Sequence, residues 1–99
     1  SRGLGDVYKR QDEFCVILPQ MPLEEAAKVM ERMRETFGNY RNAQIPELRV
    51  SLSIGLADFQ PLFSDAAMWL NAADRALYTA KETGRNRVNV SDYVVAHSA

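Results

Sequence analysis

The 99-residue sequence has few of the residues that indicate secretion, a metal cluster or nucleic-acid binding. It contains one cysteine, Cys15, and one histidine, His97. A single cysteine cannot form an internal disulfide, and Cys15 lies in an apolar run, as a small buried side chain would. His97 has no cysteine or carboxylate ligand pattern beside it, which argues against a metal or catalytic role. The net charge of −1 shows no basic excess, which argues against a general nucleic-acid-binding protein.

Long apolar runs are also missing. The longest uninterrupted ones have roughly five residues, far fewer than the ~20 of a membrane-spanning helix. No charged-then-apolar signal opens the sequence. The length allows one small domain. We therefore expect a cytoplasmic domain without a membrane segment.

The first half of the sequence predicts a strand followed by a helix. Residues 14–18 form a short apolar run that ends at Pro19, which is typical of a strand covered on both faces. Pro22 is expected to open the helix in its first turn, and Gly38 to end it. The apolar stripe of this helix is predicted at Leu23, Ala26, Met30, Met33 and Phe37.

The second half predicts a strand, a helix and a last strand. From Leu48 to Ala57, large apolar residues alternate with mostly small ones, so one face of a strand would let a helix or a ligand approach closely. Ser64 or Asp65 is expected to cap a helix that runs to about residues 81–83, with Trp69 as a core anchor. Residues 87–90 predict a short strand. The order strand-helix-strand-helix-strand favours an α/β fold with parallel pairings, its helices packed on a small sheet.

The end of the second predicted helix carries two cations. Gly84 lies just past the helix, where a left-handed backbone is common. Lys81 in the last turn and Arg85 four positions later can point at the same space, which suits an anion with several oxygens, such as a polyphosphate. The same cations could instead only complement the helix dipole. The helix would bury a face made of Leu70, Ala73, Leu77 and Ala80.

Three motifs in this order resemble those of one family. They are Asp12-Glu13-Phe14 with the apolar run after it, Val50-Ser51-Leu52-Ser53-Ile54-Gly55, and the run Ala-Asp-Arg-Ala-Leu-Tyr-Thr-Ala-Lys-Glu-Thr-Gly-Arg-Asn-Arg-Val from Ala73 to Val88. Together they resemble the GGDEF domain of diguanylate cyclases, which condense two GTP molecules into cyclic di-GMP. The resemblance implies an α+β sandwich of the nucleotide-cyclase type, here as an incomplete GGDEF fold.

The resemblance also implies a site. Asp12 matches a carboxylate that binds Mg²⁺ (or Mn²⁺), and Glu13 a carboxylate that helps to activate the attacking 3′-hydroxyl. Lys81 and Arg85 match the pair that holds the GTP phosphates. The partners implied are GTP and, for catalysis in the parent protein, a second copy in a homodimer. Without the family, Asp12 and Glu13 would read as an ordinary solvated turn before a strand.

The sequence departs from the family before Asp12. Arg10-Gln11 stand where the family has Gly-Gly, and the family's first strand with its metal-binding aspartate, its guanine-reading helices and its product-inhibition motif have no counterpart. Residues 6–11 can be back-translated into a string that resembles a transposon end used to prepare sequencing libraries. We therefore expect residues 1–11 to be a non-native leader, 12–90 a partial GGDEF domain and 91–99 a C-terminal tail.

Three functions remain open from the sequence. The chain could be part of a catalytic diguanylate cyclase, and retention of the four matched site residues favours this. It could belong to a non-catalytic GGDEF module that binds GTP or cyclic di-GMP as a signalling receptor. It could also be an α/β interaction fragment without a nucleotide site. For the 99-residue chain by itself, we expect no cyclase activity.

Overall fold

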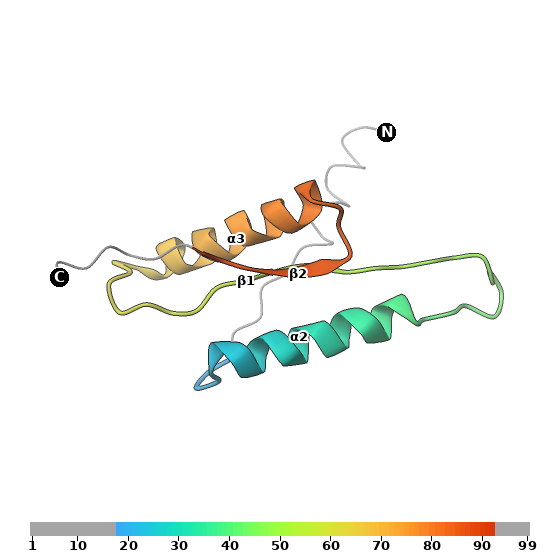
Figure 1. Cartoon of the computed structure of the whole chain (residues 1–99), viewed down its shortest axis with the longest axis horizontal. Helices are drawn as coiled ribbons and strands as arrows, with labels where there is room; N and C mark the ends of the chain where they lie inside the picture. The colour runs from blue at the N-terminus through green and yellow to red at the C-terminus, as the bar shows by residue number, and fades with distance from the viewer. Residues whose placement is uncertain (1–17, 93–99) are drawn as a thin grey trace.

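The computed structural model describes residues 18–92, which form two helices and two strands in the order α2 (Leu23–Gly38), β1 (Ser53–Leu56), α3 (Ala66–Glu82) and β2 (Arg87–Val90). The strands lie between the helices, with α3 on one face of the sheet and α2 on the other (Figure 1). This is a small α/β arrangement, consistent with part of the predicted fold. Of the strand predicted at residues 14–18, residues 14–17 lie outside the described part of the chain.

The strands β1 and β2 pair in parallel, with Ser53 opposite Arg87 and Leu56 opposite Val90. The prediction of parallel pairing across a helix is thus confirmed, as is the strand at residues 87–90. The prediction of one continuous strand from Leu48 to Ala57 is wrong for its first half, because β1 covers only four residues. Residues 48–52 have no strand partner among residues 18–92, and a strand needs a neighbour for its backbone hydrogen bonds.

The small face of β1 packs against α3. A Cβ atom added to Gly55 would lie 2.2 Å from the backbone nitrogen of Leu77 and 2.3 Å from the carbonyl oxygen of Ala73. The helix backbone therefore touches the strand at Gly55. Of the two alternatives for the small face, a helix or a ligand, a helix accounts for the small residue there.

The buried stripe of α3 consists of alanines at four-residue spacing. Ala72, Ala76 and Ala80 are buried, and Ala73 and Leu77 are half-buried. Leu70 is 53% exposed, so the prediction that it lies on the buried face of the helix is wrong. The buried stripe runs through the alanines, and Leu70 lies at the edge of that stripe in the first turns of the helix.

Local signals set the ends of α3. The Asp65 carboxylate accepts a hydrogen bond from the backbone N–H of Met68 at 3.1 Å, so Asp65 is the N-cap. At the other end, the hydroxyl of Thr83 donates to the carbonyl of Thr79 at 2.7 Å. The predicted boundaries of this helix are therefore confirmed.

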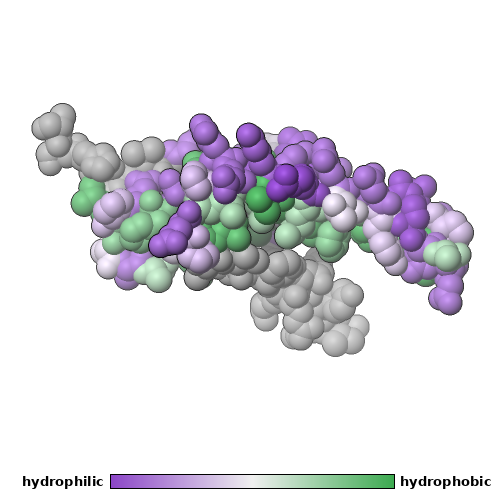
Figure 2. Space-filling view, turned by 90° about the horizontal axis from the view of Figure 1, so that it is seen from below, coloured by the Kyte–Doolittle hydropathy of each residue, from purple (hydrophilic) through white to green (hydrophobic). Residues whose placement is uncertain are grey.

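Helix α2 buries only the first half of its predicted stripe. Ala26 and Met30 are buried, whereas Met33 and Phe37 are 38% and 45% exposed. Pro22 lies before the helix as an extended N-cap residue, not in its first turn, and its carbonyl accepts the N–H of Ala26 at 2.9 Å. The outward side of α2 is charged and gives the molecule a hydrophilic band when it is seen from that side (Figure 2).

Candidate functional site

The candidate site is the turn of residues 84–86, which joins α3 to β2. Gly84, Arg85 and Asn86 all have positive φ, at 131°, 61° and 49°. The backbone N–H of Arg85 donates to the carbonyl of Ala80 at 2.8 Å, which closes the helix in the manner of a Schellman motif. Glycine adopts positive φ readily and asparagine tolerates it, but arginine does so at a cost. The turn is thus a strained backbone segment, of the kind that often lies at ligand-binding sites.

The turn places the two predicted phosphate-binding residues at one end of the sheet. Lys81 is the basic residue of the last turn of α3 and is half-buried. Arg85 is exposed, four residues later, at the start of the connection to β2. Within residues 18–92, the guanidinium of Arg85 makes no hydrogen bond or ion pair. The placement is compatible both with an anion site and with cations that complement the helix dipole.

Asn86 fixes this turn to both neighbouring layers. Its backbone N–H donates to the hydroxyl of Ser53, the first residue of β1, at 3.1 Å. Its side-chain oxygen accepts a hydrogen bond from Nη1 of Arg34 on α2 at 2.9 Å. Sequence reasoning missed both contacts. The asparagine after Arg85 was a local signal for a left-handed residue, but nothing in the sequence connects it with Arg34, 52 positions away.

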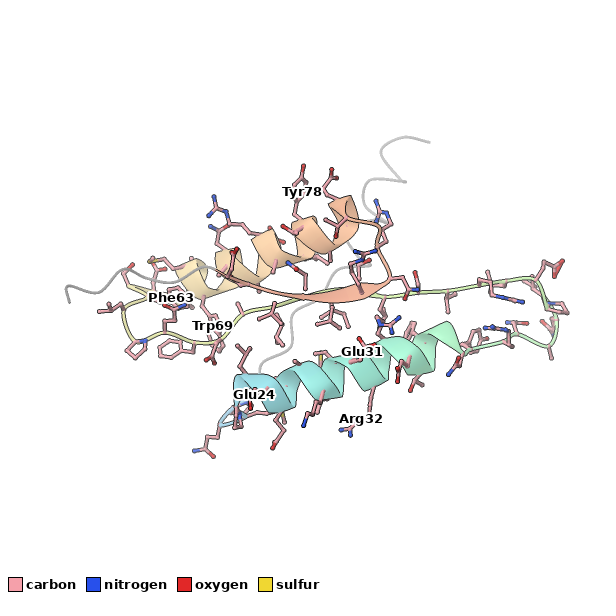
Figure 3. All side chains as sticks on the ribbon, viewed as in Figure 1. Glu24, Glu31, Arg32, Phe63, Trp69 and Tyr78 are labelled. Carbon is pink, nitrogen blue, oxygen red and sulfur yellow. The ribbon has the colours of Figure 1, made fainter. Side chains whose placement is uncertain are left out.

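Arg34 is itself held by Glu31. Its Nε donates to one carboxylate oxygen of Glu31 at 3.0 Å, and its Nη2 donates to the other. Hydrogen bonding by Arg34 lowers the pKa of Glu31, and the carboxylate in turn raises the pKa of Arg34. Glu31 lies on the side of α2 that faces the strands, whereas the neighbouring Arg32 points away from them (Figure 3). The bidentate pair orients the guanidinium so that its remaining nitrogen reaches Asn86.

The predicted carboxylates of the site, Asp12 and Glu13, lie outside the described residues. From residue 18 to residue 92, no three His, Cys, Asp or Glu side chains gather closely enough to hold a metal ion. The described part of the predicted site therefore contains its two cations, Lys81 and Arg85, and no such metal-binding cluster. The roles of Asp12 and Glu13 stay predictions from the family resemblance.

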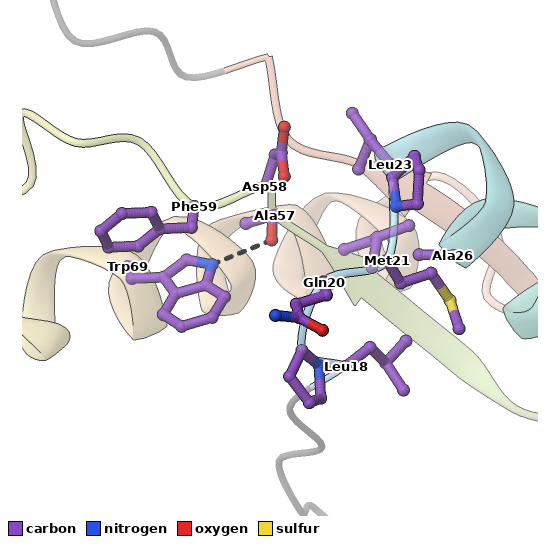
Figure 4. Close-up of a pocket in the computed structure, with 12 residues that line it drawn as sticks. Leu18, Gln20, Met21, Leu23, Ala26, Ala57, Asp58, Phe59 and Trp69 are labelled. Carbon is purple, nitrogen blue, oxygen red and sulfur yellow. Dashed lines mark hydrogen bonds between the residues drawn. The ribbon is translucent and has the colours of Figure 1, made fainter.

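A hollow lies at the opposite end of the sheet from this turn. It has a volume of about 340 Å³ and lies where β1 ends and α2 begins (Figure 4). Leu23, Ala57, Phe59 and Trp69 contribute to its wall, and the indole N–H of Trp69 donates to the carbonyl of Ala57 at 2.9 Å. The basic turn and this mostly apolar pocket are separate features.

Comparison with known proteins identifies the family to which this α/β domain belongs. Residues 5–87 match the family model described as "Diguanylate cyclase, GGDEF domain". The chain belongs to the GGDEF family. The resemblance seen in the three motifs is thereby confirmed.

Curated relatives of this GGDEF chain come from bacteria. It is 40% identical over 80 residues to "Probable diguanylate cyclase DgcC" of Escherichia coli strain K12, an alignment that covers 81% of the chain and 22% of the relative. It is 39% identical over 87 residues to "Probable diguanylate cyclase DgcT" of the same strain, covering 84% and 19%. "Uncharacterized protein YhcK" of Bacillus subtilis strain 168 is 39% identical over 85 residues, covering 82% and 23%. The chain thus spans about a fifth of the length of these relatives.

The GGDEF chain also shows, in its described part, no helix with the length and apolar character needed to cross a membrane.

Proposed function

We propose that this chain is the C-terminal part of a GGDEF domain whose parent protein is a cytoplasmic diguanylate cyclase that condenses two GTP molecules into cyclic di-GMP. In this proposal Lys81 and Arg85 hold the GTP phosphates. Asp12 would hold Mg²⁺ (or Mn²⁺), which neutralises phosphate charge when it is bound, and Glu13 would help to activate the 3′-hydroxyl. The parent would act as a homodimer with one GTP on each subunit.

The observation that carries the proposal is the turn that follows α3. Its positive-φ backbone leaves the Arg85 side chain exposed at the end of the helix that also carries Lys81. A planar guanidinium and a flexible ammonium are complementary donors for a polyphosphate. A polyphosphate bound there would meet two cations that reach it from separate backbone positions.

The test is a titration of the 99-residue chain with GTP, monitored by the NMR shifts of the backbone amides of residues 81–87. Lys81→Ala and Arg85→Ala should each weaken GTP binding, since each removes a charge-assisted contact that contributes about 1.5–3 kcal/mol. Glu35→Ala, on the exposed side of α2, is the control and should leave the affinity unchanged. If both substitutions lower the melting temperature but leave GTP affinity intact, the two cations only complement the helix dipole.

The same chain should form no cyclic di-GMP from GTP. It lacks sequence counterparts for the guanine pocket and for the second metal carboxylate, so two substrates would not be oriented for attack. Product formation above a heat-inactivated control would contradict this expectation.

A second function is favoured if Arg10-Gln11 belong to the natural sequence and not to the expected leader. Arg10-Gln11 stand where the family has Gly-Gly, and side chains there would obstruct a substrate that lies close to the backbone. A non-catalytic GGDEF module that binds GTP or cyclic di-GMP as a receptor would tolerate this. The gene sequence upstream of Asp12 distinguishes the two functions, because natural glycines there would favour the cyclase.

A further inference from the structure

The turn of residues 84–86 is held in its conformation by groups from outside the turn. Arg85, at φ 61°, is neither glycine nor asparagine, so its left-handed backbone is unfavourable unless its surroundings impose it. One constraint comes from within α3, where the carbonyl of Ala80 accepts the N–H of Arg85. A second acts on Arg85 itself, whose carbonyl accepts a hydrogen bond from Nε of Arg87 at 3.0 Å. Two more act on the next residue, Asn86, from β1 and from α2.

The contact from α2 is directional. Glu31 occupies Nε and Nη2 of Arg34, which leaves Nη1 to donate to the side-chain oxygen of Asn86. A guanidinium makes these three bonds at once because its donors are fixed in one plane. The side chain of Arg34 is only 21% exposed, so its position is restricted by packing as well.

We propose that Arg34 is a positioning residue for phosphate binding, which acts through Asn86 to hold the turn that presents Arg85. The inference rests on the proposed phosphate-binding role of Arg85. Arg34 touches no phosphate in this mechanism. Its contribution is to keep the turn ordered before the ligand arrives, so that less conformational entropy is lost on binding.

The mechanism makes a prediction that a long-range charge effect does not. If Arg34 attracted phosphate only by its charge, Arg34→Lys would bind as the natural chain does. Lysine has three donors on a single nitrogen and cannot reproduce the planar fork between Glu31 and Asn86. Arg34→Lys and Arg34→Met should therefore both weaken binding.

The experiment titrates inorganic tripolyphosphate into the ¹⁵N-labelled 99-residue chain and follows the amides of Arg85 and Asn86. Arg34→Lys, Arg34→Met and Asn86→Gly should each weaken binding by about threefold to tenfold, the effect of losing one hydrogen bond. Asn86→Gly is informative because glycine keeps the left-handed backbone accessible while it removes the acceptor. Arg32→Met is the matched control, since Arg32 lies on the same helix but is exposed and points away from the strands (Figure 3).

Two further measurements separate positioning from general destabilisation. Without ligand, the NMR order parameters of the Arg85 and Asn86 amides should fall in the Arg34 variants, while those in the middle of α3 stay unchanged. On an Arg85→Ala background, Arg34→Met should cause no additional loss of affinity, because the two residues act through one contact.

The outcomes distinguish this inference from the proposed function. If Arg85→Ala weakens binding but Arg34→Lys and Asn86→Gly do not, the phosphate site stands and the positioning role is wrong. The positioning role is also wrong if the loss from Arg34→Met persists in full on the Arg85→Ala background. If the natural chain does not bind tripolyphosphate, or if Arg85→Ala binds it as tightly, the phosphate site is wrong and the positioning role is wrong with it.

Discussion

The two ends of the small sheet are held together by different interactions. At the end where β1 begins, Ser53 and Arg34 fix the exposed Asn86 by directional hydrogen bonds. At the end where β1 finishes, the ring of Phe59 packs in T-shaped arrangements against Trp69, 5.3 Å away, and Phe63, 6.1 Å away. Hydrogen bonds define geometry at little net gain in stability, whereas apolar burial contributes stability with little directionality. We therefore expect changes at the aromatic end to affect folding and changes at the basic end to affect binding.

The largest effect should come from a substitution at Gly55, where the backbone of α3 packs directly against β1. Gly55→Ala would place a methyl group 2.2 Å and 2.3 Å from backbone atoms of Leu77 and Ala73, which cannot move aside as a side chain can. The helix would have to shift, and we expect a loss of about 3 kcal/mol or more in the free energy of unfolding. Thermal unfolding followed by circular dichroism measures this loss.

The matched control for this change is Gly38→Ala at the end of α2. Nothing lies within 4 Å of the Cβ position there, and the residue does not have positive φ. Its stability should stay the same or rise slightly, because alanine is the better helix former. If Gly55→Ala were tolerated equally well, the close packing of α3 on β1 would be wrong.

The next largest effect should be confined to the aromatic end. Trp69→Ala removes a half-buried indole, its contact with Phe59 and its hydrogen bond to Ala57. We expect a loss of about 2–3 kcal/mol in unfolding free energy, below the range for a fully buried tryptophan. Tyr78→Ala, at a position that is 65% exposed, should change the stability by less than about 0.5 kcal/mol.

Trp69→Ala also tests whether the two ends are independent. At a temperature where the Trp69→Ala variant is still folded, its affinity for tripolyphosphate should equal that of the natural chain, since effects at distant sites without shared partners are usually additive. A clear loss of affinity would show that the pocket and the basic turn are coupled.

The sequence predicted most reliably the features that depend on near neighbours. Asp65 and Gly84 marked the ends of α3 because capping acts within a few residues. The family motifs identified the GGDEF chain and placed Lys81 and Arg85 at one helix end. What failed depended on distant partners. The pattern of residues 48–52 suits a strand, but no described neighbour pairs with it.

The same limit applies within the candidate site. That Asn86 would meet a side chain from α2 could not be read from either segment, because the contact exists only after both helices have packed on the sheet. Leu70 shows the reverse error. Its spacing from Ala73 and Leu77 suggested burial, but the alanines set the direction of the buried face of α3, because they let the helix approach Gly55.

The smallest expected effect is a pH dependence at the basic end. Arg34 lowers the pKa of Glu31 below its ordinary value of 4.5, chiefly through their hydrogen bonds. A carboxyl whose pKa is lower in the folded chain stabilises that state fully above the unfolded pKa, and loses this contribution as the pH falls through the folded pKa. Glu31→Gln should therefore reduce stability slightly near neutral pH and not at all in acid below the folded pKa, where Glu31 is already protonated.

Carboxyl ¹³C shifts of Glu31 during a pH titration measure the pKa of this carboxyl directly. In the Arg34→Met variant the pKa of Glu31 should move up toward 4.5, because its hydrogen-bond donor is gone. In the Trp69→Ala variant it should stay where it is, since the aromatic end shares no group with the pair. An unchanged pKa after Arg34→Met would mean that Glu31 does not hold Arg34, and therefore does not orient its guanidinium toward Asn86.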